Sequence, residues 1–449
     1  MHTMRIHLLC DQKWRDLPNL TALKRALEKG GYRVLLSTTK DAAPMIQAFR
    51  PDCVVFNHLF SPANQKMAAA LRASGVVVVI LPTEGAGRPE TLSLTDGEFA
   101  DFRHMDLHLA WSAPAAEGIR ARWGFDESVV PVLGCTRLDF YAPQFRRAIT
   151  PREVFCRQHD LDPERPIVTW ATAHNFADIS KDRDALGKFL REGNDNGLAV
   201  CYRRIGVDPL RLTTIHAEDR AAAADAFVKL AAARPQVQFI LRPHPVESRD
   251  FYRTLIAEYS LHNVRFCPRD YIWNVLNASS VHLHRHCTTA IEAWMWDKPT
   301  IEMNMGPPSE LVWPDREAGS DVATTADALI GIVDRYLGGA SVDADKIAYR
   351  RQYIHTWFGP ADGKRCAAAA EVIDGLLRAR GRHRTLLSPL RGIKASPRQV
   401  ATAVARYALG RLPNEPLLRR VPRQKIDPTD KQITRGDVKA YLPLVAAAI

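Results

Sequence analysis

The chain has 449 residues, of which 46% are hydrophobic and 25% are charged, and its formal net charge is +11. This balance excludes a disordered or low-complexity chain, and the length predicts two or more domains. No stretch approaches the ~20 consecutive apolar residues of a transmembrane helix, and the N-terminal MHTMRIHLLC leads into a strand without the layout of a signal peptide. We therefore expect a cytoplasmic protein.

Residues 1–147 alternate segments typical of strands and helices. The predicted strands are Met4–Leu9, Val34–Ser37, Cys53–Asn57, Val76–Leu81, Leu107–Trp111 and Val129–Leu133, and the predicted helices are Asn19–Lys29, Ala63–Ala73 and Ala115–Trp123. This spacing predicts a first domain with a parallel sheet covered by helices on both faces. No GxGxxG follows the first strand, so the dinucleotide-binding fingerprint is absent.

A second alternating series predicts a second domain over residues 164–340. Its strands are expected at Ile167–Ala171, Val237–Leu241, Val264–Cys267, Ser279–Leu283 and Thr300–Met303, and its helices at Asp219–Ala233, Arg249–Tyr259 and Thr289–Asp297. The fold class expected for the body is α/β, with two doubly wound domains. Further helices over residues 341–377 are expected to close it.

Residues 378–449 form a basic tail. Thirteen Lys or Arg residues stand against one acid, Glu415, between Arg378 and Lys425. Within it, Ser396–Leu412 has the periodicity of a helix that could lie on an anionic membrane surface, or could pack on the body. Nucleic acid is not expected as a partner, because Tyr407 is the single aromatic residue between Arg378 and Lys425.

The motif Arg242-Pro243-His244-Pro245 ends the strand Val237–Leu241, because two prolines cannot continue a hydrogen-bonded ladder. Arg242 and His244 are therefore held at a strand end. A fixed cation and an imidazole at such a place can offset the charge of a departing nucleotide phosphate. The alternative for His244 is a buried histidine that caps a turn.

Two hydroxyl residues follow the HLHRHC segment, and Thr288 or Thr289 is expected to cap a helix. The free N–H groups and the positive dipole end of that helix would then face an anion. Glu292 lies three or four residues further on the same face, where it could bond a ribose hydroxyl. Otherwise Glu292 is an acid on the helix surface.

Glu84 follows the strand Val76–Leu81 through Pro82, so it is expected at a strand carboxyl end. A carboxylate there could accept the proton of an acceptor hydroxyl. The alternative is a loop acid bonded to nearby N–H groups.

The order of four motifs resembles that of bacterial surface-polysaccharide glycosyltransferases of the GT-B type. The motifs are Thr83-Glu84-Gly85, then GxxRxD (Gly134, Arg137, Asp139), then Arg242 to Pro245, then Thr288 with Thr289. The likeness, over roughly residues 80–305, is to the group with the capsule Kdo transferases and the polysialyltransferases, and more distantly to the CDP-glycerol glycerophosphotransferases. It implies two Rossmann-like domains facing a cleft, an acceptor domain first and a nucleotide-donor domain second.

In the polysialyltransferases a carboxylate beside a glycine is thought to act as the base, and an HP pair and two serines contact the donor phosphate. The resemblance places these roles on Glu84, on His244 with Pro245, and on Thr288 with Thr289. The chain departs from the pattern in having one acid before Gly85 and threonines in place of serines.

No metal or other cofactor is expected. His282, His284 and His286 alternate on one predicted strand face, but zinc is the less favoured interpretation because no further ligand is fixed beside them. Asp182-Arg183-Asp184 has the DxD form that chelates metals in other glycosyltransferases, yet it precedes a predicted helix and is interpreted as an N-cap cluster. The eight cysteines form no CxxC pair and are interpreted as reduced thiols.

These features predict a cytoplasmic glycosyltransferase, peripheral at the inner membrane, that moves a sugar onto a surface polysaccharide or lipid-linked glycan. The resemblance implies a CMP-linked ulosonic acid, such as Kdo or a sialic-type sugar, as the donor. Two alternatives remain: a transferase or epimerase that uses a UDP- or CDP-linked donor on the same fold, and a non-catalytic factor of glycan assembly or export.

Overall fold

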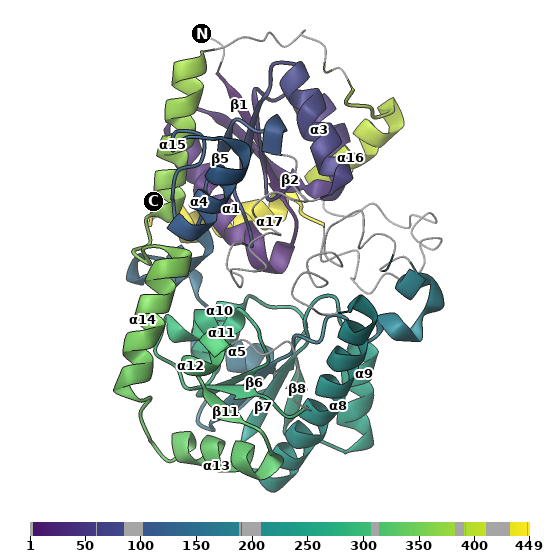
Figure 1. Cartoon of the computed structure of the whole chain (residues 1–449), viewed down its shortest axis with the longest axis vertical. Helices are drawn as coiled ribbons and strands as arrows, with labels where there is room; N and C mark the ends of the chain where they lie inside the picture. Colours follow the sequence, from purple (N-terminus) through teal and green to yellow (C-terminus); the bar gives the residue numbers. More distant parts are fainter. Residues whose placement is uncertain are drawn as a thin grey trace. The chain divides into compact units, whose positions relative to one another are not determined.

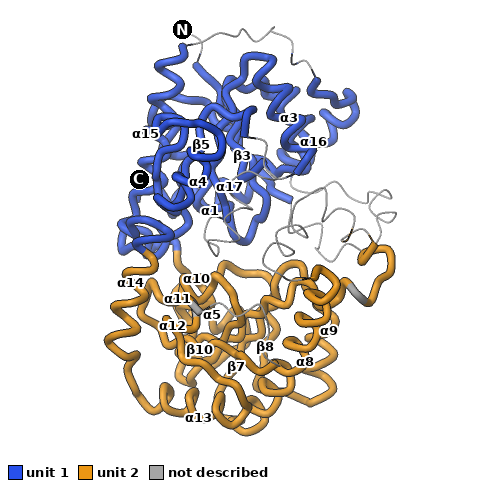
Figure 2. Tube along the Cα trace, viewed as in Figure 1, with its two compact units in different colours: residues 1–148, 195–201, 355–449 blue, residues 149–194, 202–354 orange. Residues whose placement is uncertain are grey.

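The computed structural model describes residues 3–59, 61–84, 102–187, 190, 208–306, 314–381, 390, 392–409, 432–446 and 448–449. The chain divides into two compact units, which Figure 2 colours separately. Unit 1 comprises residues 1–148, 195–201 and 355–449, and unit 2 comprises residues 149–194 and 202–354. Within the described ranges, no helix combines the length and the apolar character needed to cross a membrane.

Unit 1 contains a parallel sheet with the strand order β2-β1-β3-β4-β5 (Figure 1). Its strands are β1 (Arg5–Cys10), β2 (Arg33–Thr38), β3 (Cys53–Phe56), β4 (Val77–Ile80) and β5 (Leu107–His108). Its helices are α1 (Lys13–Lys29), α2 (Ala42–Phe49), α3 (Pro62–Ala73), α4 (Ala113–Trp123), α15 (Arg365–Arg380), α16 (Pro397–Leu409) and α17 (Arg435–Ala446).

Both faces of this sheet are buried, because alternate residues of one strand enter two different cores. Leu8 of β1 packs with α1, α15 and α17, whereas Leu9 packs with α2, α3 and α4. The strands therefore carry continuous apolar runs, as strands with two covered faces do. Burial on this scale contributes ~25 cal/mol per Å² of apolar surface and is the main stabilising term of the unit.

The described part of the basic tail packs on unit 1. Helix α16 lies against α2, where Arg406 bonds Asp41 at 2.9 Å, and Lys13 of α1 bonds Asp437 of α17 at 2.6 Å. Val438 of α17 belongs to the same core as β1. The segment 410–431, which carries six of the tail's basic residues, lies outside the described residues.

The GxxRxD motif joins the body of unit 1 to helix α15. Asp139 is fully buried and accepts hydrogen bonds from the N–H groups of Arg365 at 3.0 Å and Cys366 at 2.7 Å, so it caps α15. Gly134 has a φ of 95°, and a Cβ there would lie 3.2 Å from the Phe358 carbonyl oxygen. The motif therefore has a structural explanation within unit 1.

Two predicted elements of unit 1 differ from the structure. Val129–Leu133 forms a single bridge between Val132 and Ala110 instead of a strand, because Pro131 has no N–H to continue the ladder. Helix α1 begins at Lys13 and includes Pro18, where the prediction began at Asn19.

Unit 2 contains a parallel sheet with the strand order β11-β10-β9-β6-β7-β8 (Figure 1). Its strands are β6 (Ile167–Ala171), β7 (Gln238–Arg242), β8 (Val264–Phe266), β9 (Val281–His284), β10 (Thr300–Met303) and β11 (Asp321–Ala323). Its helices are α5 (Arg152–Gln158), α8 (Pro209–Ala233), α9 (Arg249–Glu258), α10 (Ile272–Ala278), α11 (Thr289–Trp294), α12 (Pro314–Ala318), α13 (Ala326–Leu337) and α14 (Ala344–Phe358), whose last turn passes into unit 1.

The core of unit 2 is built on β6, β7 and β9. Trp170 of β6 is fully buried, with its ring 4.8 Å from Phe227 of α8 and 5.9 Å from Tyr252 of α9. Two doubly wound parallel sheets confirm the predicted α/β fold class, and helices follow in the C-terminal region as expected.

We expect Asp139→Ala to lower the free energy of unfolding of unit 1 by about 2 kcal/mol or more, because two buried N–H groups of α15 lose their acceptor. Urea denaturation followed by circular dichroism measures the change. Asp126→Ala is the matched control, since Asp126 accepts from Ser128 and Val129 in an exposed turn. Equal losses in both variants would contradict the proposed role of Asp139.

Candidate functional site

The carboxyl ends of three neighbouring strands of unit 2 lie level with one another. Ala171 at the end of β6 pairs with Arg242 of β7 on one side and with His284 of β9 on the other. On the next strand, Glu302 of β10 pairs with His284. Because all strands are parallel, the segments that follow them emerge at one edge of the sheet, where ligands of open α/β sheets bind.

The loop with Arg242 and His244 is fastened to the end of β6. The N–H group of Thr172 donates to the Arg242 carbonyl oxygen at 3.0 Å, and the His244 N–H donates to Thr172 Oγ1 at 3.1 Å. Thr172 in turn donates its hydroxyl to Glu247 at 2.7 Å. The half-buried Pro245 completes the turn between His244 and Glu247.

Glu247 is the buried centre of this loop, with 1% of its surface exposed. It also accepts hydrogen bonds from the His174 N–H at 3.0 Å and from the Tyr252 hydroxyl. Burial raises the pKa of Glu247, while the hydrogen bonds from Tyr252 and Thr172 oppose that rise. Glu247 therefore fixes the backbone on both sides of the Arg242–Pro245 turn.

Arg242 has a polar atom without a partner, whereas His244 is bonded to the residues around it. Arg242 Nη1 is buried without a hydrogen-bond partner, and no carboxylate of the described residues forms an ion pair with this guanidinium. The Val246 N–H donates to His244 Nδ1 at 3.4 Å. A buried cationic N–H donor without an acceptor is costly, so Arg242 Nη1 favours an anionic ligand.

Two neutral histidines lie beside this edge. His174, which is 2% exposed, has a buried Nε2 without a hydrogen-bond partner. Burial, then the charges of His216 and Arg285, lower the pKa of His174 well below its usual value. Burial, then Arg285 and Arg220, lower the pKa of His216 to about 3. Burial is thus the first cause of the lowered pKa at both rings, and arginines contribute after it.

Arg220 of α8 is fully engaged in the structure. It forms two hydrogen bonds of 2.7 Å with the carboxylate of Asp178, and its guanidinium lies 4.2 Å from the ring centroid of Phe251. This fork-like pairing fixes the segment after β6 against α8 and α9. Arg220 therefore shapes the edge without offering a free charge.

A buried charge network holds the turn that follows β9. Arg285 is 2% exposed; its Nε donates to Asp219 at 3.0 Å and its Nη1 to Glu302 at 3.1 Å. Glu302 Oε1 also accepts the N–H of His286 at 2.9 Å, and Oε2 lies 2.8 Å from His284 Nδ1. Burial alone would raise the pKa of Glu302, but His284, His286 and Arg285 lower it on balance.

The three alternating histidines do not share one strand face. β9 ends at His284, and His286 has a φ of 50°, in the left-handed region that turns the chain away from the strand. His282 Nε2 bonds Thr289 Oγ1 at 2.9 Å, and His284 Nε2 bonds Ser320 Oγ at 3.0 Å. Each of these two rings has its own hydroxyl partner, and the two rings stack with centroids 5.9 Å apart.

The two threonines differ from the expected helix cap. α11 is six residues long, and Thr288 at its N-cap makes no side-chain capping hydrogen bond, because its ψ of −12° is helical rather than extended. Thr289 bonds His282 instead. Glu292, expected either at a ribose or on the surface, is 7% exposed in the first turn of α11.

Glu84 belongs to unit 1 and lies at the carboxyl end of that sheet. Its side chain is 73% exposed and pairs with Arg15 Nη1 at 2.9 Å, while Arg15 also bonds Thr83 at 3.1 Å. Gly85 lies outside the described residues. Glu84, Thr83 and Arg15 line a cavity of about 110 Å³ in unit 1, together with Asn57, whose buried amide has no hydrogen-bond partner there.

Asp182 caps the segment that follows it, as predicted. Its Oδ1 accepts the N–H groups of Asp184 at 2.9 Å and Ala185 at 3.0 Å. The DxD sequence is therefore an N-cap cluster in the structure.

Several polar residues of the edge were not predicted from the sequence: Thr172, His174, His216, Arg220, Glu247, Arg285 and Glu302. Three of them carry a signal that could have found them. Glu302 is an acid inside the apolar strand Thr300–Met303, and buried charges need partners. Thr172 and His174 follow the buried strand β6 directly, as strand-end polar residues do in this fold class.

No family model and no curated protein matches the chain. The chain is similar to several solved structures. They include S. aureus MnaA in a co-structure with UDP (12% identity, 84% of this chain and 98% of that chain, TM-score 0.52). A Neisseria meningitidis UDP-GlcNAc 2-epimerase bound to UDP-GlcNAc has 14% identity, coverage of 82% and 99%, and a TM-score of 0.50. A Methanocaldococcus jannaschii UDP-GlcNAc 2-epimerase with UDP-GlcNAc and UDP has 12% identity, coverage of 82% and 99%, and a TM-score of 0.50. At these identities the likeness shows the fold, which is GT-B-like.

We expect Glu302→Gln to destabilise unit 2 by about 3 kcal/mol, because Arg285 and His284 lose a buried charge partner. The lowered pKa of Glu302 means that its stabilisation is present above the ordinary glutamate pKa of about 4.3 and is lost as the pH falls below it. The difference between wild type and variant should therefore shrink towards acid pH in urea denaturation series.

Glu317→Gln is the control for this experiment, since Glu317 is partly buried and accepts one hydrogen bond from Asn304 at 3.1 Å. A loss in Glu302→Gln no larger than in the control would contradict the anchoring role of Glu302.

Proposed function

We propose that this protein is an enzyme that acts on a nucleotide sugar and binds the diphosphate of a UDP-linked donor at the carboxyl edge of the unit 2 sheet. One observation carries the proposal: Arg242 Nη1 is buried without a hydrogen-bond partner at the level of the β6, β7 and β9 ends. A diphosphate supplies the anion that this guanidinium needs.

Two features support an anion at this place. His174 Nε2 is buried without a hydrogen-bond partner, and Arg285 and Arg220 contribute, after burial, to the lowered pKa of both His174 and His216. In the proposed site Arg242 supplies charge to the diphosphate and His244 donates to a phosphate oxygen as the sugar–phosphate bond breaks. Thr288, Thr289 and Glu292 at the start of α11 are proposed to contact the nucleotide.

UDP is proposed in place of the CMP-linked donor expected from the sequence. Three solved proteins whose fold resembles that of the chain were determined with UDP or UDP-GlcNAc. The acceptor glycan, the surface-polysaccharide role and the membrane contact of the tail stay predictions from the sequence.

The proposed reaction is glycosyl transfer, with Glu84 of unit 1 as the base that accepts the proton of the acceptor hydroxyl. The unit 1 cavity could hold that acceptor, since Asn57 offers a buried amide donor and acceptor there. Epimerisation of the donor sugar is the second candidate, because the similar solved structures include epimerases. Release of UDP that depends on an acceptor indicates transfer, whereas an altered donor sugar without acceptor indicates epimerisation.

We expect the full chain to bind UDP more tightly than CMP in calorimetric titrations. Arg242→Gln and His244→Ala should each weaken UDP binding or turnover by about 100-fold, because each removes a phosphate contact. His262→Ala is the control, as an exposed histidine of the same unit. Wild-type affinity and turnover in both variants would remove the proposed donor site, and a preference for CMP would restore the first expectation.

We expect Glu84→Gln to leave UDP affinity unchanged but to lower transfer by about 100-fold, because the amide cannot accept the proton. The exposed pair with Arg15 is worth less than about 1 kcal/mol, so the melting temperature should hardly change. Glu127→Gln is a matched control, since Glu127 is 82% exposed and pairs with Arg120. Retained transfer with a lowered melting temperature would show that Glu84 only braces its loop.

A further inference from the structure

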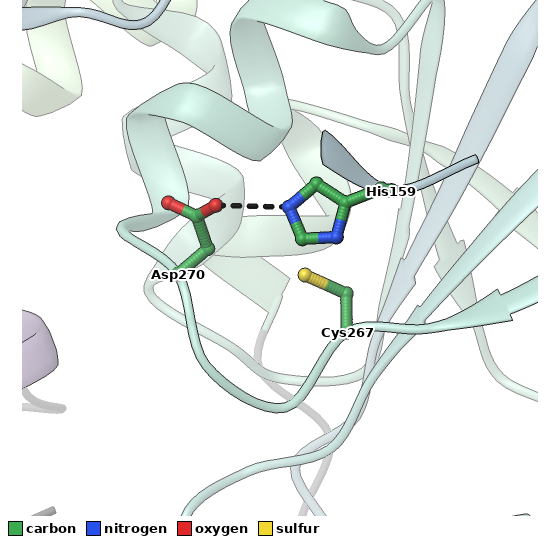
Figure 3. Close-up of side chains that lie close together, drawn as sticks. All are labelled: His159, Cys267 and Asp270. Carbon is green, nitrogen blue, oxygen red and sulfur yellow. Dashed lines mark hydrogen bonds and ion pairs between the residues drawn. The ribbon is translucent and has the colours of Figure 1, made fainter. Parts of the chain in front are cut away.

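Three potential metal ligands meet at the edge strand β8 of unit 2. Cys267 follows β8, Asp270 lies just before α10, and His159 follows the last residue of α5. One ligand atom from each side chain lies within 4.8 Å of the other two. Figure 3 shows the Asp270 carboxylate and the Cys267 sulfur on two sides of the His159 ring, both directed towards it.

The carboxylate of Asp270 is already oriented by its neighbours. Its Oδ1 accepts the N–H of Tyr271 at 2.7 Å and the side-chain amide of Asn274 at 2.8 Å, and its Oδ2 lies 3.1 Å from His159 Nε2. Asn274 is held in turn by the Thr150 N–H at 2.9 Å. Metal-binding carboxylates usually have such outer partners, which leave one oxygen directed at the ion.

The imidazole and the thiol are fixed by packing. The His159 ring lies 4.3 Å from the ring of Phe155 in α5. Cys267 is 2% exposed, and its N–H bonds the Leu241 carbonyl oxygen of β7 at 2.9 Å. The backbone of each ligand residue is therefore anchored in a regular element or beside one, so the three side chains need little ordering on metal binding.

The spacing of the ligand atoms fits a tetrahedral ion after a small adjustment. Zinc bonds of about 2.0–2.3 Å to nitrogen, oxygen and sulfur place neighbouring ligands about 3.3–3.6 Å apart. The 3.1 Å between His159 and Asp270 is close to this value, and separations of at most 4.8 Å need to shorten by about 1 Å. Rotation about side-chain bonds supplies such a movement.

The ligand types favour zinc among the common protein metals. A thiolate and an imidazole are softer ligands than the all-oxygen sets of Mg²⁺ and Ca²⁺, and one cysteine, one histidine and one carboxylate suit a tetrahedral Zn²⁺. The side chains of His159 and Asp270 are 22% and 15% exposed, so water can reach a fourth position.

We propose that unit 2 binds a structural zinc ion through the Cys267 thiolate, one His159 imidazole nitrogen and the Asp270 carboxylate. The ion joins the end of β8 and the start of α10 to the end of α5, which lies more than a hundred residues earlier in the chain. Its role is to stabilise this edge of the sheet, and no step of the proposed sugar chemistry runs through it.

The test is the metal content of the full chain purified without chelators, followed by replacement of zinc with Co²⁺. We expect one zinc ion per chain and, with cobalt, the near-ultraviolet charge-transfer band of a Co–thiolate bond. Chelation should lower the melting temperature of the wild type by several degrees. Cys267→Ser should abolish the charge-transfer band, weaken zinc binding by more than about 100-fold and remove the effect of the chelator.

Cys156→Ser is the matched control, since Cys156 is a buried thiol in α5, one turn before His159. It should keep the zinc, the cobalt band and the response to chelation. His159→Gln provides a second ligand variant should Cys267→Ser fail to fold. Full chain that neither contains zinc nor binds added zinc would overturn the proposal, as would a cobalt–thiolate band that survives in Cys267→Ser.

Discussion

The carboxyl edge of unit 2 depends on one buried carboxylate, that of Glu302. It lies in the middle of an apolar strand and is fully buried, so its charge has to be compensated inside the protein. Arg285, His284 and the N–H of His286 provide that compensation, and all three belong to the end of β9 or the turn after it. The same contacts hold His286 at a φ of 50°, which costs a non-glycine residue about 1 kcal/mol or more. One strand thus fixes the turn that leads into α11.

A second carboxylate, Glu247, does the same for the turn after β7. It ties the loop of Arg242 and His244 to the end of β6 through Thr172 and the His174 N–H. The two acids lie on opposite sides of β6, because β7 and β9 are its neighbours. Because all strands are parallel, the two turns lie at the same edge of the sheet. Each turn is held by its own carboxylate, so the polar groups of the turns are fixed in position. Preorganised donors of this kind are what a site for a charged leaving group requires.

The fold could be predicted from the sequence because the strands of both sheets are covered on two faces. Such strands are continuous apolar runs, and Val76–Leu81 and Ile167–Ala171 could be placed to within a residue or two. The RPHP turn was equally predictable, since two prolines end a strand on purely local grounds. The short helix α11 and the turn at His286 could not be predicted in this way. Their conformations depend on tertiary contacts with Glu302 and His282, which have no local sequence signal. The partners Glu247 and Arg285, and the group of His159, Cys267 and Asp270, are likewise products of tertiary structure.

The distribution of charge at this edge explains why we assign ligand binding to Arg242 and not to the neighbouring Arg220 and Arg285. Arg220 is neutralised by Asp178, and Arg285 by Asp219 and Glu302, so each completes a network within unit 2. Arg242 has no such carboxylate among the described residues, and its Nη1 is buried. Leaving a buried donor unsatisfied costs about 1–3 kcal/mol, and more for a charged group. An anion that binds at Arg242 removes this cost. Ligand binding and the stability of unit 2 are therefore linked, because the unsatisfied donor destabilises the unit without ligand and strengthens the binding of phosphate.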